Sequence, residues 1–247
     1  MTQPRAVKLL IPILVTMFSL AETQAQQLCT IEDRLAEFGE IVRARLAPKF
    51  DAAGVQYPPA RATFIGIKQA REIEIYAADA AGPLTFICTY PVLAASGVLG
   101  PKLREGDRQV PEGIYGIREL NPNSLYHLSL WIDYPNEYDC AHAEAEGRTE
   151  PGGEIMIHGD AVSRGCLAVG DPAAEDFFVL AAVTGIKNVK VILTPVDFRA
   201  GVAPELPDLA PPWTAELYEN IKRELAPYPR PSESDTTALS LPQASTR

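Results

Sequence analysis

Apolar residues recur at intervals of three and four along three stretches of the chain, the spacing that places them on one face of a helix. These stretches cover 31–47, 171–184 and 213–225. Thr30 and Asp33 resemble a capping box at the start of the first predicted helix. Asp171 precedes Pro172 and is the predicted N-cap of the second helix, which Gly185 would close. Three helices are therefore expected.

Alternation of apolar and polar residues, together with short apolar runs between turn residues, predicts strands. The expected strands cover 63–68, 72–77, 84–90, 114–119, 124–132, 154–157 and 188–194. The second of these alternates strictly, so we expect one side of it to face solvent. In the fifth, Leu128, Leu130 and Ile132 share the expected core face.

Two stretches rich in polar residues separate the expected strands. They cover 96–113 and 133–153, and both are predicted to be loops. Combined with the helices, this pattern predicts an α+β fold. We expect a mixed, mostly β domain with an N-terminal helix and flanking helices.

The first residues of the 247-residue chain look like a secretory signal. Arg5 and Lys8 precede an apolar run over 9–21, and cleavage after Ala21 or Ala25 would fit the small residues that follow. The last 20 or so residues lack apolar periodicity, which is typical of disorder. The predicted divisions are a signal peptide at 1–25, an N-terminal helical segment at 26–54, the main domain at 55–225 and a disordered tail at 226–247.

A formal net charge of −10 argues against nucleic acid or an anionic membrane surface as an electrostatic partner. The chain has no glycine-rich phosphate loop and no paired spacing of Cys or His typical of a zinc site. We therefore expect neither a cofactor nor a metal. Export permits disulfides, and Cys29, Cys88 and Cys140 could form one bridge and leave one thiol, or form none.

The stretch 155–171, IMIHGDAVSRGCLAVGD, contains the strongest candidate chemistry. His158 would lie at a strand end, and Cys166 follows a short polar loop. A thiol attacks acyl carbon as the thiolate, so its pKa of about 8.5 would need to be lowered by a nearby imidazolium or by backbone dipoles. A histidine supplies a proton acceptor, and Gly159 and Gly165 let backbone N–H groups approach an oxyanion. The alternative is a buried, inert cysteine beside a structural histidine.

The pattern IHG…SRGC resembles the active-site signature of YkuD-type L,D-transpeptidases, in which an HG pair precedes an S/T-x-G-C nucleophile motif. The segments SGVLGPKLREGDRQVPEG, YHLSL and DYPN resemble the YafK-like subgroup of that family. The resemblance covers roughly 55–225 and implies a YkuD-like catalytic domain over these residues.

The resemblance implies a periplasmic cysteine enzyme that acts on peptidoglycan stem peptides. The thiolate would attack the carbonyl at the L-centre of diaminopimelate, and an amine would resolve the thioester in a transpeptidase. Water would resolve it in a hydrolase or amidase that cuts stem peptides or protein–peptidoglycan linkages, in which case a wall-linked lipoprotein is a further partner. A non-catalytic cell-wall-binding module is the alternative of another class.

Residue by residue, the resemblance implies that Cys166 is the nucleophile and His158 the general base. Gly159 would orient the imidazole through its backbone, and Ser163 would shape the turn. The N–H groups of Gly165 and Cys166 are the expected oxyanion donors.

Two further side chains are candidates for binding substrate. Arg164 stands where many family members have histidine, and it could bind a substrate carboxylate or be a solvated surface residue. His127 could point into the cleft, although an exposed histidine or one satisfied in the core is the more common arrangement.

Overall fold

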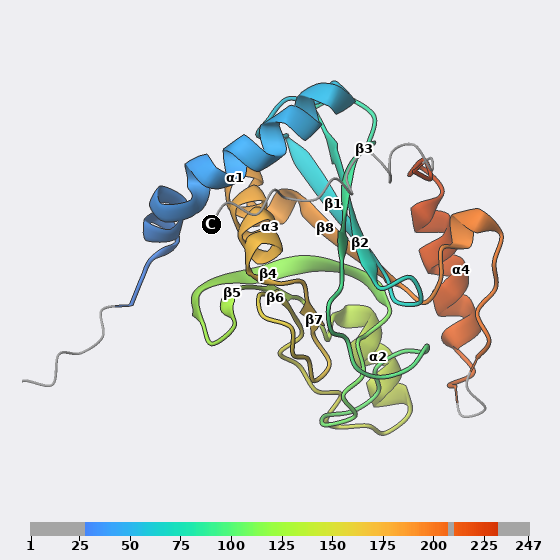
Figure 1. Ribbon diagram of the computed structural model, residues 1–247. Helices are drawn as coiled ribbons and strands as arrows, with labels where there is room; N and C mark the ends of the chain where they lie inside the picture. Colours follow the sequence, from blue (N-terminus) through green and yellow to red (C-terminus); the bar gives the residue numbers. More distant parts are fainter. Residues whose placement is uncertain (1–27, 207–209, 232–247) are drawn as a thin grey trace, which may run out of the picture.

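The computed structural model describes residues 28–206 and 210–231, which form one curled, eight-stranded sheet flanked by helices (Figure 1). The spatial order of the strands is β3-β2-β1-β8-β4-β5-β6-β7. The strands are β1 (Arg61–Ile67), β2 (Glu72–Ala78), β3 (Thr85–Pro91), β4 (Gly113–Ser124), β5 (His127–Ile132), β6 (Met156–His158), β7 (Leu167–Ala168) and β8 (Val189–Thr194). The helices are α1 (Ile31–Ala53), α2 (Glu137–Ala145), α3 (Asp171–Thr184) and α4 (Thr214–Leu225), with short 3₁₀ turns η1 (Ile186–Asn188) and η2 (Phe198–Ala200).

The long strand β4 joins the two halves of the sheet. Its first residues, 113–116, pair with β8, and its later residues pair with β5. Only two pairs of neighbours are parallel, β1 with β8 and β6 with β7. The chain is thus an α+β protein, as the sequence pattern predicts.

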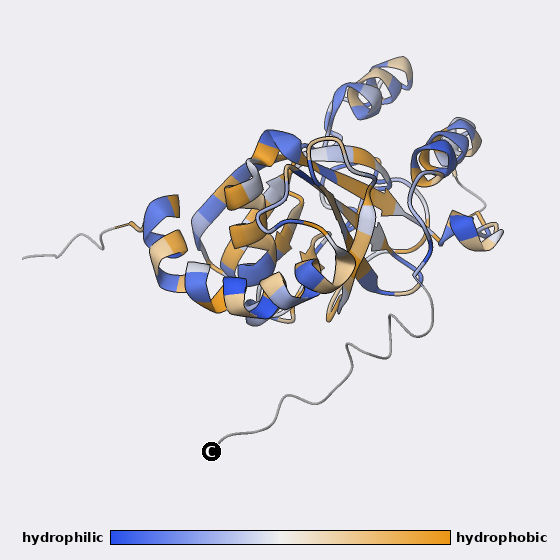
Figure 2. Cartoon of the chain, turned by 90° about the horizontal axis from the view of Figure 1, so that it is seen from above, coloured by the Kyte–Doolittle hydropathy of each residue, from blue (hydrophilic) through white to orange (hydrophobic). Residues whose placement is uncertain are grey.

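Helices cover both faces of the sheet around β1. Phe64 and Ile65 are neighbours on β1, so their side chains point to opposite faces. Phe64 packs edge-to-face on Phe177 of α3, with ring centroids 4.9 Å apart, in a core that α1 shares. Ile65 belongs to the core under α4. Figure 2 shows the apolar positions gathered on the inner sides of the sheet and helices.

Helix α1 begins where the capping box predicts and ends later than predicted. The Thr30 hydroxyl accepts a hydrogen bond from the backbone N–H of Asp33, and the carboxylate of Asp33 accepts one from the N–H of Thr30. The helix continues past 47 to Ala53 because Phe50 extends the buried apolar stripe by another turn. Gly54 then ends the helix in the left-handed conformation.

Three predicted local structures are wrong. The stretch 133–153 is not entirely a loop, because Asn136 caps helix α2 and accepts hydrogen bonds from two N–H groups of its first turn. The stretch 124–132 is not one strand, because β4 and β5 meet at a turn whose tip, Leu125, is 96% exposed. The N-cap of α3 is Gly170 rather than Asp171, and the Asp171 carboxylate instead accepts a hydrogen bond from the N–H of Asp160.

Strand β2 is buried on both sides, against the prediction of a solvent-facing side. Helix α4 and the turn at η2 cover the face that Glu74 and Tyr76 share. The carboxylate of Glu74 pairs with the guanidinium of Arg199 at 2.7 Å, which compensates its burial.

The chain after α4 packs on the body as far as Pro231, so the predicted disordered tail begins too early at 226. Tyr228 is only 3% exposed, and its hydroxyl lies 3.1 Å from the hydroxyl of Thr63. The rest of that tail and the predicted signal peptide at 1–25 lie outside the described residues. In the ranges that are described, no helix is long and apolar enough to cross a membrane.

A buried ion pair attaches the loop between β3 and β4 to the body of the protein. The ammonium of Lys68 lies 2.8 Å from the carboxylate of Glu112, and both side chains are buried. The same carboxylate accepts hydrogen bonds from the N–H of Gly100 at 2.8 Å and from the hydroxyl of Tyr218 at 2.7 Å. Lys68 also donates to the carbonyl of Val110 at 2.9 Å. The middle of the loop and its end before β4 are therefore fixed to Lys68, which follows β1, and to α4.

Replacing Lys68 with Met should lower the free energy of unfolding by about 3 to 5 kcal/mol, because it leaves the charge of Glu112 buried without its partner. The matched control is Lys190→Met, whose pair with Glu224 is partly exposed and should contribute less than about 1 kcal/mol. Urea unfolding followed by circular dichroism measures both values. Equal losses in the two variants would contradict the assignment.

Candidate active site

The parallel pairing of β6 with β7 brings His158 and Cys166 to one cleft. In this pair Ile157 lies opposite Leu167 and His158 opposite Ala168, so the register continued by one residue places Cys166 beside Met156. Residues two apart on a strand share a face, and Met156, His158 and Cys166 all line the same cleft. The cleft has a volume of about 570 Å³, and its other lining residues are Glu105, Tyr126, Gly153, Glu154, Val162, Ser163 and Arg164.

The imidazole of His158 is held in the form that acts as a base. Its Nδ1 lies 2.6 Å from the carbonyl oxygen of Gly159. Because a carbonyl only accepts hydrogen bonds, Nδ1 must carry the proton, and Nε2 of the neutral ring is an acceptor. The backbone contact expected from Gly159 is thus present. The ring of Tyr126 lies tilted over the imidazole, with centroids 4.6 Å apart.

Cys166 is a buried, neutral thiol in this structure. It is 8% exposed, and its S–H donates a hydrogen bond to the carbonyl of Glu154, 3.5 Å away. Burial raises the pKa of the Cys166 thiol, although a hydrogen bond from the Met156 backbone opposes the shift. Burial likewise lowers the pKa of His158. Burial therefore opposes the lowered thiol pKa expected from the sequence, and it favours a neutral thiol and a neutral imidazole in the resting pair.

Close packing explains Gly159, and backbone conformation explains Gly165. A side chain at Gly159 would bring its Cβ to 2.5 Å from a carboxylate oxygen of Asp171 and to 2.7 Å from the carbonyl of Tyr126. Gly165 has a φ of 102°, a backbone conformation that residues other than glycine rarely adopt. Only glycine therefore fits at these two positions, each of which is next to a candidate catalytic residue.

The N–H groups expected to bind an oxyanion already have acceptors. The hydroxyl of Ser163 accepts from the N–H of Cys166 at 3.1 Å and donates to the carbonyl of the same residue at 2.6 Å. The N–H of Gly165 donates to the hydroxyl of Ser96 at 2.7 Å. Ser163 thus closes the turn as predicted, and the two N–H groups are not open to the cleft in this state.

The two candidate substrate-binding residues lie in different environments. Arg164 is exposed on the rim of the cleft. His127 does not line this cleft, because its Nε2 lies 3.0 Å from the carboxylate of Glu175 on α3 and its ring packs edge-to-face on Phe38 of α1. The structure therefore does not bring His127 into the cleft, as a substrate-binding role there would require.

Sequence reasoning missed several residues of the cleft, notably Tyr126, Glu105 and Glu154. They come from the turn before β5 and from the two loops that precede β4 and β6. Glu105 and Tyr126 lie in two of the segments that carry the family resemblance, which was the available signal, whereas only the fold shows that Glu154 belongs to the site.

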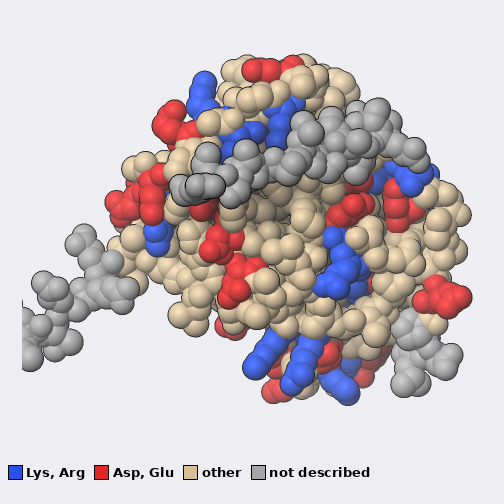
Figure 3. Space-filling model, viewed as in Figure 1, with Lys and Arg blue, Asp and Glu red and all other residues tan. Residues whose placement is uncertain are grey.

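No group of three or more His, Cys, Asp or Glu residues within 28–206 and 210–231 could hold a metal ion. The four cysteines all lie in these ranges and form no disulfide. Cys88 is buried, which raises the pKa of its thiol to about 11, and Cys140 is exposed on α2. Figure 3 shows acidic and basic side chains on the same face of the molecule, with basic groups gathered along its lower edge.

Residues 76–193 match the YkuD family, described as the L,D-transpeptidase catalytic domain. The chain carries a YkuD domain. The matched range contains both His158 and Cys166.

The YkuD domain here is also similar to a protein of Escherichia coli (strain K12) named "Putative L,D-transpeptidase YafK", with 39% identity over 112 residues. This match covers 43% of the chain and 43% of the relative, so the chain aligns with less than half of that protein's length. Among solved structures, it resembles the helical cell shape determining protein Pgp2 from Campylobacter jejuni at 25% identity, over 56% of this chain and 48% of that one, with a TM-score of 0.46. It also resembles Bd1075 from Bdellovibrio bacteriovorus at 21% identity, over 67% of this chain and 54% of that one, with a TM-score of 0.39.

Alkylation of Cys166 by iodoacetamide should rise with pH and reach its midpoint above that of an ordinary thiol, because burial raises the pKa of the Cys166 thiol and only the thiolate reacts. His158→Gln should leave this midpoint nearly unchanged, since burial lowers the pKa of His158 and the ring is already neutral at these pH values. Peptide mass spectrometry measures the rate, with exposed Cys140 as the internal reference. A midpoint well below 8.5 that rises in the variant would instead indicate an imidazolium–thiolate pair.

Proposed function

We propose that this protein is an exported peptidoglycan L,D-transpeptidase that acts through a thioester on Cys166. The observation that carries the proposal is the cleft of the YkuD domain, in which a thiol and a histidine fixed in its basic tautomer line one wall. A signal peptide at 1–25 would deliver the enzyme to the periplasm, where stem peptides are exposed.

The proposed reaction begins with the stem peptide bound in the cleft. Nε2 of His158 takes the proton of the Cys166 thiol as Sγ attacks the carbonyl carbon at the L-centre of diaminopimelate. The tetrahedral intermediate collapses, the C–N bond breaks, and the imidazolium returns its proton to the departing amine. A thioester remains on Cys166. An acceptor amine loses a proton to His158, attacks the thioester, and releases the thiol.

Neutral resting groups suit this sequence of steps. A neutral imidazole can accept a proton at pH 7, whereas an imidazolium cannot. Because burial raises the pKa of the Cys166 thiol, little thiolate is present at pH 7, and His158 would remove the proton during the reaction. Arg164 on the rim is the proposed partner for a substrate carboxylate, which its guanidinium can bind with two parallel hydrogen bonds.

His158→Gln should slow formation of a carbapenem adduct on Cys166 by at least about a hundredfold, because the reaction loses its general base. Cys166→Ala should form no adduct at that peptide. The matched control is His142→Gln, which removes a histidine that stacks on Trp213 and does not line the cleft. Stopped-flow fluorescence and intact mass give the rates. If His158→Gln reacts as fast as the unchanged protein, His158 is not the base.

The acceptor is tested by incubating the protein with defined tetrapeptide muropeptides and analysing the products by liquid chromatography and mass spectrometry. We expect crosslinks between two diaminopimelate residues when an amine acceptor is in excess. Trimmed monomers alone would show that water resolves the thioester and that the enzyme is a hydrolase or amidase of the same family. Unchanged substrate, with no label on Cys166, would favour the alternative that the protein is a non-catalytic wall-binding module.

A further inference from the structure

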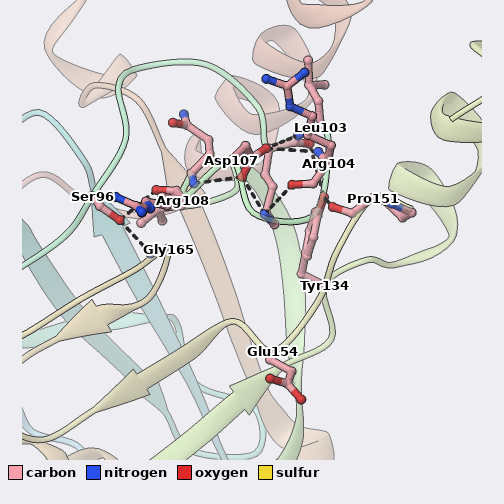
Figure 4. Close-up of polar contacts among 12 residues, drawn as sticks. Ser96, Leu103, Arg104, Asp107, Arg108, Tyr134, Pro151, Glu154 and Gly165 are labelled. Atoms are coloured by element: carbon pink, nitrogen blue, oxygen red, sulfur yellow. Dashed lines mark hydrogen bonds and ion pairs between the residues drawn. The ribbon is translucent and has the colours of Figure 1, made fainter. Parts of the chain in front are cut away.

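The loop between β3 and β4 is held in shape by its own polar side chains (Figure 4). The hydroxyl of Ser96 donates to the carbonyl of Arg108 at 2.8 Å, which joins the two arms of the loop. The side-chain amide of Gln109 accepts from the N–H of Val98 at 2.9 Å and donates to the carbonyl of Gly100 at 2.7 Å. The loop is thus a fixed, internally crosslinked support.

This support contacts the chain immediately before the candidate nucleophile. The hydroxyl of Ser96 accepts a hydrogen bond from the N–H of Gly165 at 2.7 Å, across 69 residues of sequence (Figure 4). A Cβ built on Gly165 would make ordinary van der Waals contact with the loop, 3.5 Å from the carbonyl oxygen of Gln109 and 3.7 Å from the carbonyl carbon of Arg108. Gly165 therefore rests directly on the arm of the loop that Ser96 ties in place.

The two hydrogen bonds of Ser96 fix the orientation of its hydroxyl. Because the O–H donates to Arg108, the oxygen presents a lone pair to Gly165. Gly165 is buried and has a φ of 102°, a conformation with little intrinsic preference, so an outside contact is needed to fix it. The peptide that follows carries the N–H of Cys166, which Ser163 holds from the other side.

We infer that Ser96 is a positioning residue for the nucleophile: its hydroxyl fixes Gly165, and through Gly165 it sets the direction from which the Cys166 sulfur approaches an acyl carbon. The inference rests on the proposed function. Ser96 does not line the cleft, so it acts through the backbone and not on the substrate. An error of about 1 Å in the placement of a reacting atom can slow a reaction by as much as a hundredfold.

The test separates attack geometry from thiol reactivity in the full chain. Carbapenem acylation requires an aligned approach to a carbonyl, whereas iodoacetamide alkylation requires only the thiolate. Ser96→Ala should slow acylation by about tenfold or more and change alkylation by less than about twofold. Ser96→Thr keeps the hydroxyl and should restore most of the acylation rate. Thr85→Ala, which removes a hydroxyl from the edge of β3, is the matched control and should change neither rate.

Three outcomes would overturn the inference. Acylation of Ser96→Ala at the rate of the unchanged protein would show that the contact does not position Cys166. A faster rate would show that Ser96 merely occupies an N–H that the reaction needs. An equal fall in acylation and alkylation, without rescue by Ser96→Thr, would indicate general loss of structure, which thermal unfolding would also report. Failure of the unchanged protein to acylate would instead contradict the proposed function itself.

Discussion

The candidate active site depends on the parallel pairing of two very short strands. His158 ends β6 and Cys166 directly precedes β7, with only the eight residues 159–166 between the two strands. Parallel neighbours usually need a connection of about a dozen residues or more. The shorter loop suffices here because β6 has three residues and β7 has two, so the chain need not travel back along a full strand. Pairing then places the sulfur and the imidazole on one face and one cleft wall.

Burial determines the chemistry of this pair. It favours the uncharged forms of both Cys166 and His158, so the resting site favours the thiol over the thiolate. In the proposed mechanism, reactivity therefore arises with substrate in place, when proton transfer and carbon–sulfur bond formation proceed together. Such a site requires accurate geometry more than a shifted thiol pKa. The backbone contacts of Gly159, Ser163 and Ser96 supply that accuracy from three directions.

The sequence predicts most elements and singles out two residues that the fold brings to one cleft, because both have local signals. Helical spacing, a capping box and the motif IHG…SRGC are all read within a few residues. The errors concern contacts made over long distances in the sequence. Helix α4 covers one face of β2. Glu175 and Phe38, from two different helices, contact His127. The assembled cleft buries Cys166 and thereby raises the pKa of its thiol. No local pattern encodes them.

The most direct measurement is to trap the acyl-enzyme from a defined tetrapeptide muropeptide by rapid acid quench and to locate it by peptide mass spectrometry. We expect a mass increase equal to the disaccharide–tripeptide acyl group on the peptide that contains Cys166. The increase should disappear after treatment with hydroxylamine, which cleaves thioesters, and should not form in Cys166→Ala. An acyl group found on another residue, or product formed by Cys166→Ala at the normal rate, would contradict the account.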